Sequence, residues 1–253
     1  MDILDLNVRH NATSTWRFSD TPVWSADGAP LTPDAVASRV GGKRVVFLVH
    51  GYNVRNVEWA YSAVIRNLQM RMSDTYQVIV RYWWPGSELA LAFLLARQRA
   101  PNAGRMLRSS IQALFSGSAR LRSVDIQAHS LGCMVALEAA MPDNFGPCIR
   151  NLVLAAPAVD DKDLTIGKGH DGQYVPASTN VDSIHLFHSK RDIVALPYSW
   201  LRSDRMLGAA GPSPTGRLPA NVTGHDFTRL IRADHCGYMD EPAYFDAWRA
   251  LAQ

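Results

Sequence analysis

One serine in the sequence stands in a setting typical of an enzymatic nucleophile. Ser130 lies in residues 128–132 (AHSLG), between a strand-like run and a run with helical spacing. Small residues two positions before and after the serine let a strand turn sharply into a helix, which lifts the hydroxyl above the sheet. Glycine is usual at both positions, and here the first is Ala128. We therefore predict that Ser130 is a nucleophile rather than a helix cap, with the N–H of Leu131 donating to a developing oxyanion.

A second loop supplies the other expected oxyanion donor. Residues 49–53 (VHGYN) end an apolar strand-like run well before Ser130. Gly51 permits a close backbone approach, and the N–H of Tyr52 would point at the reacting oxygen. The alternative interpretation is an ordinary strand-to-helix turn that contains a structural histidine. Three further residues are candidates for lining the substrate pocket: Asn53, Trp84 and His129.

An acid and a base follow the serine in the order used by serine hydrolases of this layout. Asp192 comes just after a late strand-like run, where it could accept a hydrogen bond from a histidine Nδ1. Asp160 and Asp161, after the preceding run, are the rival acids. His235 lies in a loop before the last helix-like segment, whereas His225 lies inside a strand-like run. We predict Asp192 as the acid and His235 as the base, since a loop histidine can reach over the strand ends.

The elements that must position these residues alternate between strand and helix. Strand-like runs cover residues 44–49, 77–82, 123–128, 151–155, 184–188 and 221–227. Helical spacing covers 56–72, 131–141 and 245–251, and a further helical stretch before residue 123 is interrupted at Pro101-Asn102. Such alternation predicts an α/β fold, with a mostly parallel central sheet and helices on both faces.

The remaining segments lead us to expect one domain over residues 1–253. Residues 1–43 alternate weakly at Ile3, Leu6 and Val8, which favours antiparallel edge strands. Residues 161–182 form a short lid-like insertion in this interpretation, with room for no large cap. We therefore expect a fairly open site.

Composition excludes several classes of protein. The chain has 253 residues, 47% hydrophobic and 19% charged, which is ordinary for a globular protein. Its net charge of +3 is spread along the chain and gives no case for nucleic-acid binding. Three cysteines rule out a disulfide scaffold and favour a reducing compartment. The amino terminus lacks the pattern of an export signal, and we expect a cytoplasmic protein.

Three other patterns in the sequence have plainer interpretations. Residues 167–172 match G-x-G-x-x-G, but no helix-like run follows, so we reject nucleotide binding. The spacing His185-x-x-His188 places the two rings on opposite faces of a strand, and we expect no metal and no cofactor. Residues 89–115 are apolar and basic, and we expect them to pack as a helix rather than to rest on lipid.

Taken together, the motifs resemble the α/β-hydrolase superfamily, and within it a group of largely uncharacterised bacterial serine hydrolases of esterase or lipase type. The resemblance spans about residues 44–250 and rests on 49–53, Trp59-Ala60, 84–86, 128–132, 189–192, 205–208, 234–238 and 245–246. It implies an α/β-hydrolase fold with a small cap or none. It also implies Ser130 as nucleophile, Asp192 as acid and His235 as base, with oxyanion amides from Tyr52 and Leu131.

The expected function is hydrolysis of acyl esters by a Ser–His–Asp triad through an acyl-enzyme. The expected partner is a small-molecule acyl ester, with no nucleic acid. Two alternatives use the same triad: a lipase or phospholipase that touches lipid through residues 89–115, and a thioesterase or amidase. An alternative of another class is a non-catalytic binding protein with a hydrolase fold.

Overall fold

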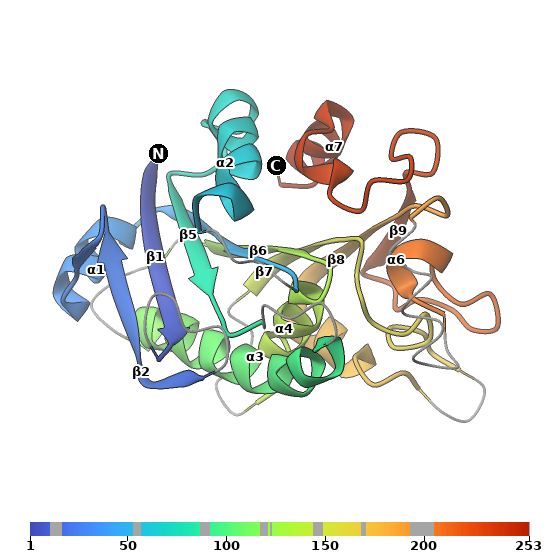
Figure 1. The fold of residues 1–253 in the computed structure, drawn as a ribbon, viewed down its shortest axis with the longest axis horizontal. Helices are drawn as coiled ribbons and strands as arrows, with labels where there is room; N and C mark the ends of the chain where they lie inside the picture. The colour runs from blue at the N-terminus through green and yellow to red at the C-terminus, as the bar shows by residue number, and fades with distance from the viewer. Residues whose placement is uncertain are drawn as a thin grey trace.

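One sheet runs through the whole molecule (Figure 1). The computed structural model describes residues 1–10, 17–52, 57–86, 92–116, 121, 123–143, 149–167, 171–192 and 205–252. The strands are β1 (Asp2–Arg9), β2 (Phe18–Ala26), β3 (Ala29–Pro30), β4 (Arg44–Val49), β5 (Val78–Trp83), β6 (Ser123–His129), β7 (Ile149–Ala155), β8 (Val181–His188) and β9 (Val222–Asp226). Their order across the sheet is β3-β2-β1-β5-β4-β6-β7-β8-β9.

The sheet is parallel from β1 to β9 and antiparallel only at the β1–β2 and β2–β3 pairs. The first strand is therefore inserted next to β5 and is not an edge strand. Its buried face carries Leu4, Leu6 and Val8, whereas Ile3 is only half-buried. The buried side chains of β1 therefore alternate regularly at every second residue from Leu4, whereas the spacing expected from the sequence begins at Ile3 and is irregular.

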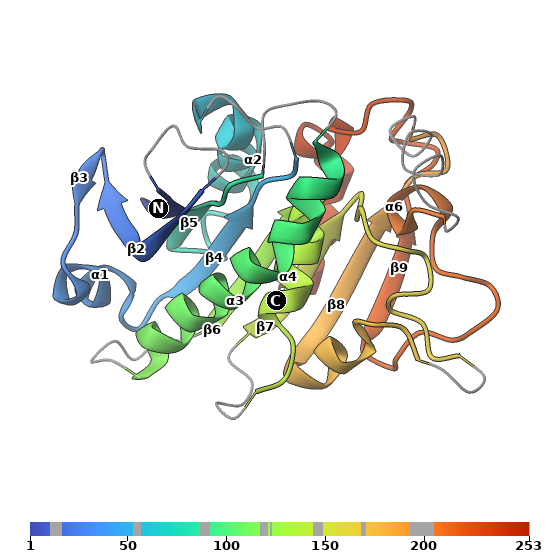
Figure 2. The ribbon, with the colours of Figure 1, turned by 60° about the horizontal axis from the view of Figure 1, so that its bottom comes forward.

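Helices cover both faces of the sheet, so the predicted architecture is confirmed. The helices are α1 (Pro33–Val40), α2 (Val57–Arg71), α3 (Phe93–Ser116), α4 (Gly132–Ala139), α6 (Leu207–Ala210) and α7 (Pro242–Leu251), with 3-10 turns at η1 (Val175–Asn180) and η2 (Gly237–Met239). In Figures 1 and 2, α2 and α7 lie on one face while α3 and α4 lie on the other.

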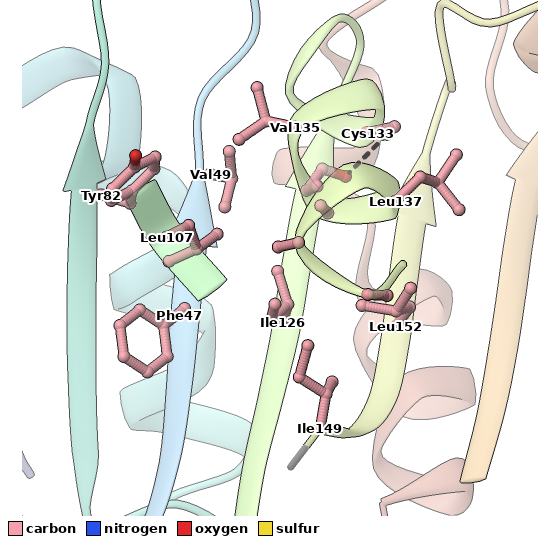
Figure 3. Close-up of a cluster of buried hydrophobic side chains, with 14 of the residues drawn as sticks. Phe47, Val49, Tyr82, Leu107, Ile126, Cys133, Val135, Leu137, Ile149 and Leu152 are labelled. Atoms are coloured by element: carbon pink, nitrogen blue, oxygen red, sulfur yellow. Dashed lines mark hydrogen bonds between the residues drawn. The ribbon is translucent and has the colours of Figure 1, made fainter. Parts of the chain in front are cut away.

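The core between the sheet and α3 and α4 is made of apolar side chains from the central strands and from both helices (Figure 3). Its labelled members are Phe47, Val49, Tyr82, Leu107, Ile126, Cys133, Val135, Leu137, Ile149 and Leu152. Central parallel strands are buried on both faces, which explains why their sequences are almost continuously apolar.

The expected interruption of the helix before residue 123 is wrong. Helix α3 continues through Pro101 to Ser116. Small residues let it lie very close to α4: a Cβ on Gly104 would come within 2.5 Å of Glu138 Cβ. The buried face of α3 offsets the hydrogen bond that proline cannot make.

The fold brings the candidate residues to one edge of the sheet. Strands β4, β6 and β8 end at Val49, His129 and His188, directly before the loops that carry the site candidates. Only a short insertion separates Ala155, at the end of β7, from Val181, at the start of β8, as expected for a small cap or none. In parallel sheets this carboxyl edge is where ligands bind.

Candidate active site

The serine of the predicted elbow has a backbone conformation that serine rarely adopts. Ser130 lies between β6 and α4 with φ +54°, in the left-handed region. The turn is held by the end of the neighbouring strand, because the Ser130 N–H donates to Ala155 O at 3.0 Å. Ala158 N–H donates back to Ser130 O at 3.1 Å. The sharp turn expected of a nucleophile elbow is thus present.

Two glycines allow the loop after β4 to lie against this turn. A Cβ on Gly132 would stand 2.4 Å from His50 O and 2.7 Å from Val49 O. A Cβ on Gly51 would stand 2.9 Å from Ser130 Cβ. The two loops therefore touch backbone to backbone.

Replacing Gly132 by alanine is expected to destabilise the protein by about 1–3 kcal/mol, because the added methyl meets backbone that cannot move aside easily. Urea unfolding measures the change. Gly224→Ala is the matched control: its Cβ would meet Pro212 Cγ at an ordinary 3.4 Å. Equal unfolding free energies for the two variants would contradict the close packing described here.

The predicted acid and base are in contact. His235 Nδ1 lies 2.6 Å from Asp192 Oδ2, and the Asp192 carboxylate is completely buried. A carboxylate only accepts, so the imidazole proton is on Nδ1. The other nitrogen, Nε2, is buried and has no hydrogen-bond partner among the residues that the structure describes. His235 thus has an oriented ring and an available Nε2 lone pair.

The rival candidates have other partners. Asp160 pairs with Arg97 at 3.5 Å, and Asp161 pairs with Arg205 at 3.0 Å. His225 lies on β9, where its Nε2 is 3.4 Å from the His185 ring. The geometry therefore joins His235 with Asp192 and with neither rival acid.

His129, a predicted pocket residue, links the elbow to the loop of the predicted base. Its Nε2 lies 2.9 Å from His235 O, and the two imidazole rings are 4.8 Å apart. A carbonyl only accepts, so Nε2 of His129 carries a proton and donates. Burial, followed by the proximity of His235, lowers the pKa of His129 to about 3. The neutral His129 ring thus holds the backbone of His235 close to the elbow.

The predicted oxyanion loop contains a second neutral histidine. His50 is buried, its Nδ1 lies 2.8 Å from Gly51 O, and its Nε2 lies 3.0 Å from the Arg9 guanidinium. Burial, with a smaller contribution from Arg9, lowers the pKa of His50 to about 3. Sequence reasoning missed Arg9, for which the only signal is a charge at the end of an apolar alternation.

The other loop candidates differ in exposure. Trp84 is completely buried and stacks on the His50 ring at 5.6 Å, which does not fit the expected place in the pocket lining. Tyr52 is half-buried, with its ring edge-on to Phe93 at 5.6 Å. The N–H of Leu131 has no backbone acceptor among the described residues. Asn53 lies outside the described residues.

The chain matches one known protein family. A family model described as "Alpha/beta hydrolase of unknown function (DUF900)" matches residues 34–243. The chain belongs to this family. The match confirms the expected membership of the α/β-hydrolase superfamily, and it begins after the strand that carries Arg9.

Comparison with solved structures finds several similar esterases, and the first named here shares the fold of this DUF900 protein. A cold-adapted esterase from an Arctic intertidal metagenomic library has 13% identity and a TM-score of 0.51, over 90% of this chain and 86% of that chain. An esterase of Pyrococcus furiosus has 11% identity and a TM-score of 0.43, over 84% and 82%. The esterase domain of a Rhodothermus marinus protein has 13% identity and a TM-score of 0.43, over 90% and 93%. No curated protein matches the chain.

Two further features bear on the expectations for this DUF900 protein. Within the described part of the chain, no group of three or more His, Cys, Asp or Glu side chains could hold a metal ion. None of the described helices has the length and apolar character needed to cross a membrane. The apolar and basic segment enters α3, whose Leu94 and Leu95 are exposed, while residues 89–91 lie outside the described residues.

The neutral histidines predict an acid-sensitive fold for the DUF900 protein. Burial lowers the pKa of His50 and His129 to about 3 and that of His185 to about 4. Below the usual histidine pKa of about 6.5, these histidines become protonated in the unfolded chain but stay neutral in the folded chain. The free energy of unfolding therefore falls as pH falls. We expect the unfolding free energy to drop between pH 7 and 5, by up to about 1.4 kcal/mol per pH unit and histidine.

Urea unfolding at several pH values measures this slope. His185→Asn has one buried histidine fewer, so its slope should be smaller than that of the wild type. A wild-type stability that does not change between pH 7 and 5 would contradict neutral, buried rings.

Proposed function

We propose that the protein is a serine hydrolase that cleaves acyl esters with Ser130 as nucleophile, His235 as base and Asp192 as acid. The single observation that carries this proposal is the 2.6 Å contact between His235 Nδ1 and the buried Asp192 carboxylate. His235 lies in a loop that contacts the elbow, because His129 Nε2 is 2.9 Å from His235 O. A Ser–His–Asp set is recognised by such roles rather than by sequence position.

In the proposed mechanism, His235 Nε2 removes the proton from Ser130 Oγ as the oxygen attacks the ester carbonyl carbon. The N–H groups of Leu131 and Tyr52 donate to the oxyanion, each contributing about 3–4 kcal/mol in the transition state. His235 then protonates the departing alcohol and leaves an acyl-enzyme on Ser130. The same imidazole deprotonates a water, which attacks the acyl carbon, and then returns that proton to Ser130 Oγ as the carboxylic acid is released. Asp192 holds the tautomer and stabilises the imidazolium.

A fluorophosphonate probe tests the proposal, because it phosphonylates a serine only where a base and an oxyanion hole activate it. We expect labelling of the folded protein at Ser130, located by peptide mass mapping, and none in Ser130→Ala. Folded wild-type protein that stays unlabelled would overturn the proposal and favour a non-catalytic binding protein.

A lipase-like preference is the second candidate function. Leu94 and Leu95 are exposed at the start of α3, next to Phe93, which contacts the oxyanion-loop residue Tyr52. An apolar surface at that place favours long acyl chains. Rates measured against acyl chain length, above and below the concentration at which the substrate aggregates, separate a lipase from an esterase. Rates with amide and thioester substrates in the same assay test the alternative that the protein is an amidase or a thioesterase.

The domain organisation is part of the same proposal. We take residues 1–253 as one domain, which is supported by a single sheet that includes strands from Asp2 to Asp226. Residues 161–182 are proposed as the short lid-like insertion. Leu164, Tyr174 and Ala177 in this segment are completely buried, so both of its halves are anchored against the fold.

A further inference from the structure

We infer that Arg9 and His50 are positioning residues, which together orient the peptide that carries the oxyanion-hole N–H of Tyr52. This inference rests on the proposed function, because an oxyanion hole matters only if acyl transfer occurs. It adds residues that the triad does not contain, one of them on a strand before the region matched by the family.

The first step is the fixed charge of Arg9. This side chain is 3% exposed, at the end of β1. Its Nε donates to Trp84 O at 3.0 Å, its Nη2 lies 3.0 Å from His50 Nε2, and its guanidinium lies 5.3 Å from the Trp83 ring centre. A guanidinium only donates and does not lose its proton in proteins. His50 Nε2 therefore must accept, and a second, longer bond reaches it from the Trp84 N–H at 3.4 Å. The single proton of the neutral ring must then be on Nδ1.

The second step is the bond that this proton makes. His50 Nδ1 lies 2.8 Å from Gly51 O, so with Nδ1 protonated it donates to that carbonyl. The carbonyl of Gly51 and the N–H of Tyr52 belong to one planar peptide group and point in opposite directions. Holding the carbonyl on the His50 side therefore turns the Tyr52 N–H to the other side. With the proton on Nε2 instead, two lone pairs would face each other and the peptide would turn.

The third step is that hydrogen bonds already fix both the N–H and the carbonyl of His50. His50 N–H donates to Tyr61 Oη at 3.1 Å, and Trp84 Nε1 donates to His50 O at 2.9 Å. A Cβ added to Gly51 would lie only 2.9 Å from Ser130 Cβ, so glycine is required at this position. The rotation of the next peptide therefore depends on the His50 ring, and through it on Arg9.

The sheet explains how a distant strand can serve this loop. Asn7 on β1 pairs with Trp83 on β5, so the end of β1 lies beside the residues that precede Trp84. This pairing places the Arg9 side chain next to the His50 ring.

The experiment combines Arg9→Met, His50→Ala and the double variant with steady-state kinetics on one ester. Oxyanion contacts form in the transition state, so kcat should fall about 10- to 100-fold while KM stays unchanged. A boronic acid, which forms a tetrahedral adduct on the serine, should lose affinity by a similar factor. Because Arg9 acts through His50, the double variant should be no slower than His50→Ala alone. Losses that multiply, or a change confined to KM, would overturn the inference.

Two variants separate positioning from general stability. Arg81→Met removes a cation 5.9 Å from the same Trp83 ring, and Arg81 is bound bidentately to Asp5. It should lower the melting temperature yet keep kcat near the wild-type value. Arg9→Lys retains a permanent donor for His50 and should recover part of the lost kcat. If Arg81→Met lowers kcat as much as Arg9→Met does, the effect is general and the inference fails.

A spectroscopic measurement tests the inference without any turnover. Long-range ¹H–¹⁵N NMR distinguishes which nitrogen of His50 carries the proton. We expect Nδ1 in the wild type and a shift of population towards Nε2 in Arg9→Met. A wild-type His50 protonated on Nε2 would overturn the inference even if no variant folds. If Ser130 fails to react with the fluorophosphonate while Nδ1 is protonated as expected, the proposed function falls and the Arg9–His50 contact stands.

Discussion

Replacing His235 by alanine is expected to lower kcat for an acyl ester by about 10⁵- to 10⁶-fold, as the loss of a triad histidine does in serine hydrolases. Without the imidazole, Ser130 has no group to take its proton, and the alcohol leaves without an acid. Activity that remains comes from substrate binding and the oxyanion hole. Steady-state hydrolysis of a chromogenic ester measures the loss, and fluorophosphonate labelling of Ser130 should disappear with it.

His225→Ala is the matched control for this experiment. His225 is a histidine of the same carboxyl-terminal region, and its ring stacks on Phe187 at 4.5 Å and reaches His185, away from Asp192. We expect its kcat to stay close to that of the wild type. Normal turnover in His235→Ala together with a large loss in His225→Ala would exchange their roles and contradict the proposed base.

Replacing Asp192 by asparagine is expected to lower kcat by about 10⁴-fold, with the fold intact, because the two side chains have the same shape. The asparagine NH₂ can donate towards His235 Nδ1, which would then lose its proton to Nε2. Nε2 would no longer have the lone pair that must accept the proton of Ser130. The measurement is kcat for the same chromogenic ester as for His235→Ala.

Asp161→Asn provides the comparison, because Asp161 is one of the two rival acids and is bound to Arg205 at 3.0 Å. We expect this variant to change stability more than kcat. Equal losses of kcat in Asp161→Asn and Asp192→Asn would contradict the assignment of the acid.

Sequence patterns predicted the architecture and the candidate triad because each signal is local. Buried parallel strands are continuous apolar runs, and a serine between a strand and a helix carries its small neighbours with it. Asp192 and His235 were found by their places after the late strands. Their contact joins residues 43 positions apart, and the sequence could only suggest it through the order of the elements.

Other features depend on packing that the sequence does not display. The continuation of α3 through Pro101 follows from its close fit against α4, where Gly104 meets Glu138. Arg9 has its partner His50 in the loop after β4, 41 positions later, and its only local signal is a charge at the end of an apolar alternation. The complete burial of Trp84 also has no local signal, because position in a motif does not determine where a side chain points.

The insertion of β1 between β2 and β5 has a consequence for how activity appears during folding. The candidate site draws on Arg9 near the amino terminus and His235 near the carboxyl terminus, joined by a sheet whose neighbouring strands are often far apart in sequence. Contacts of such long range form late and slowly. Catalytic competence therefore reports completion of the whole sheet, and a chain still emerging from the ribosome would have no working site. Regained turnover after dilution from denaturant would follow, rather than accompany, the formation of the first helices.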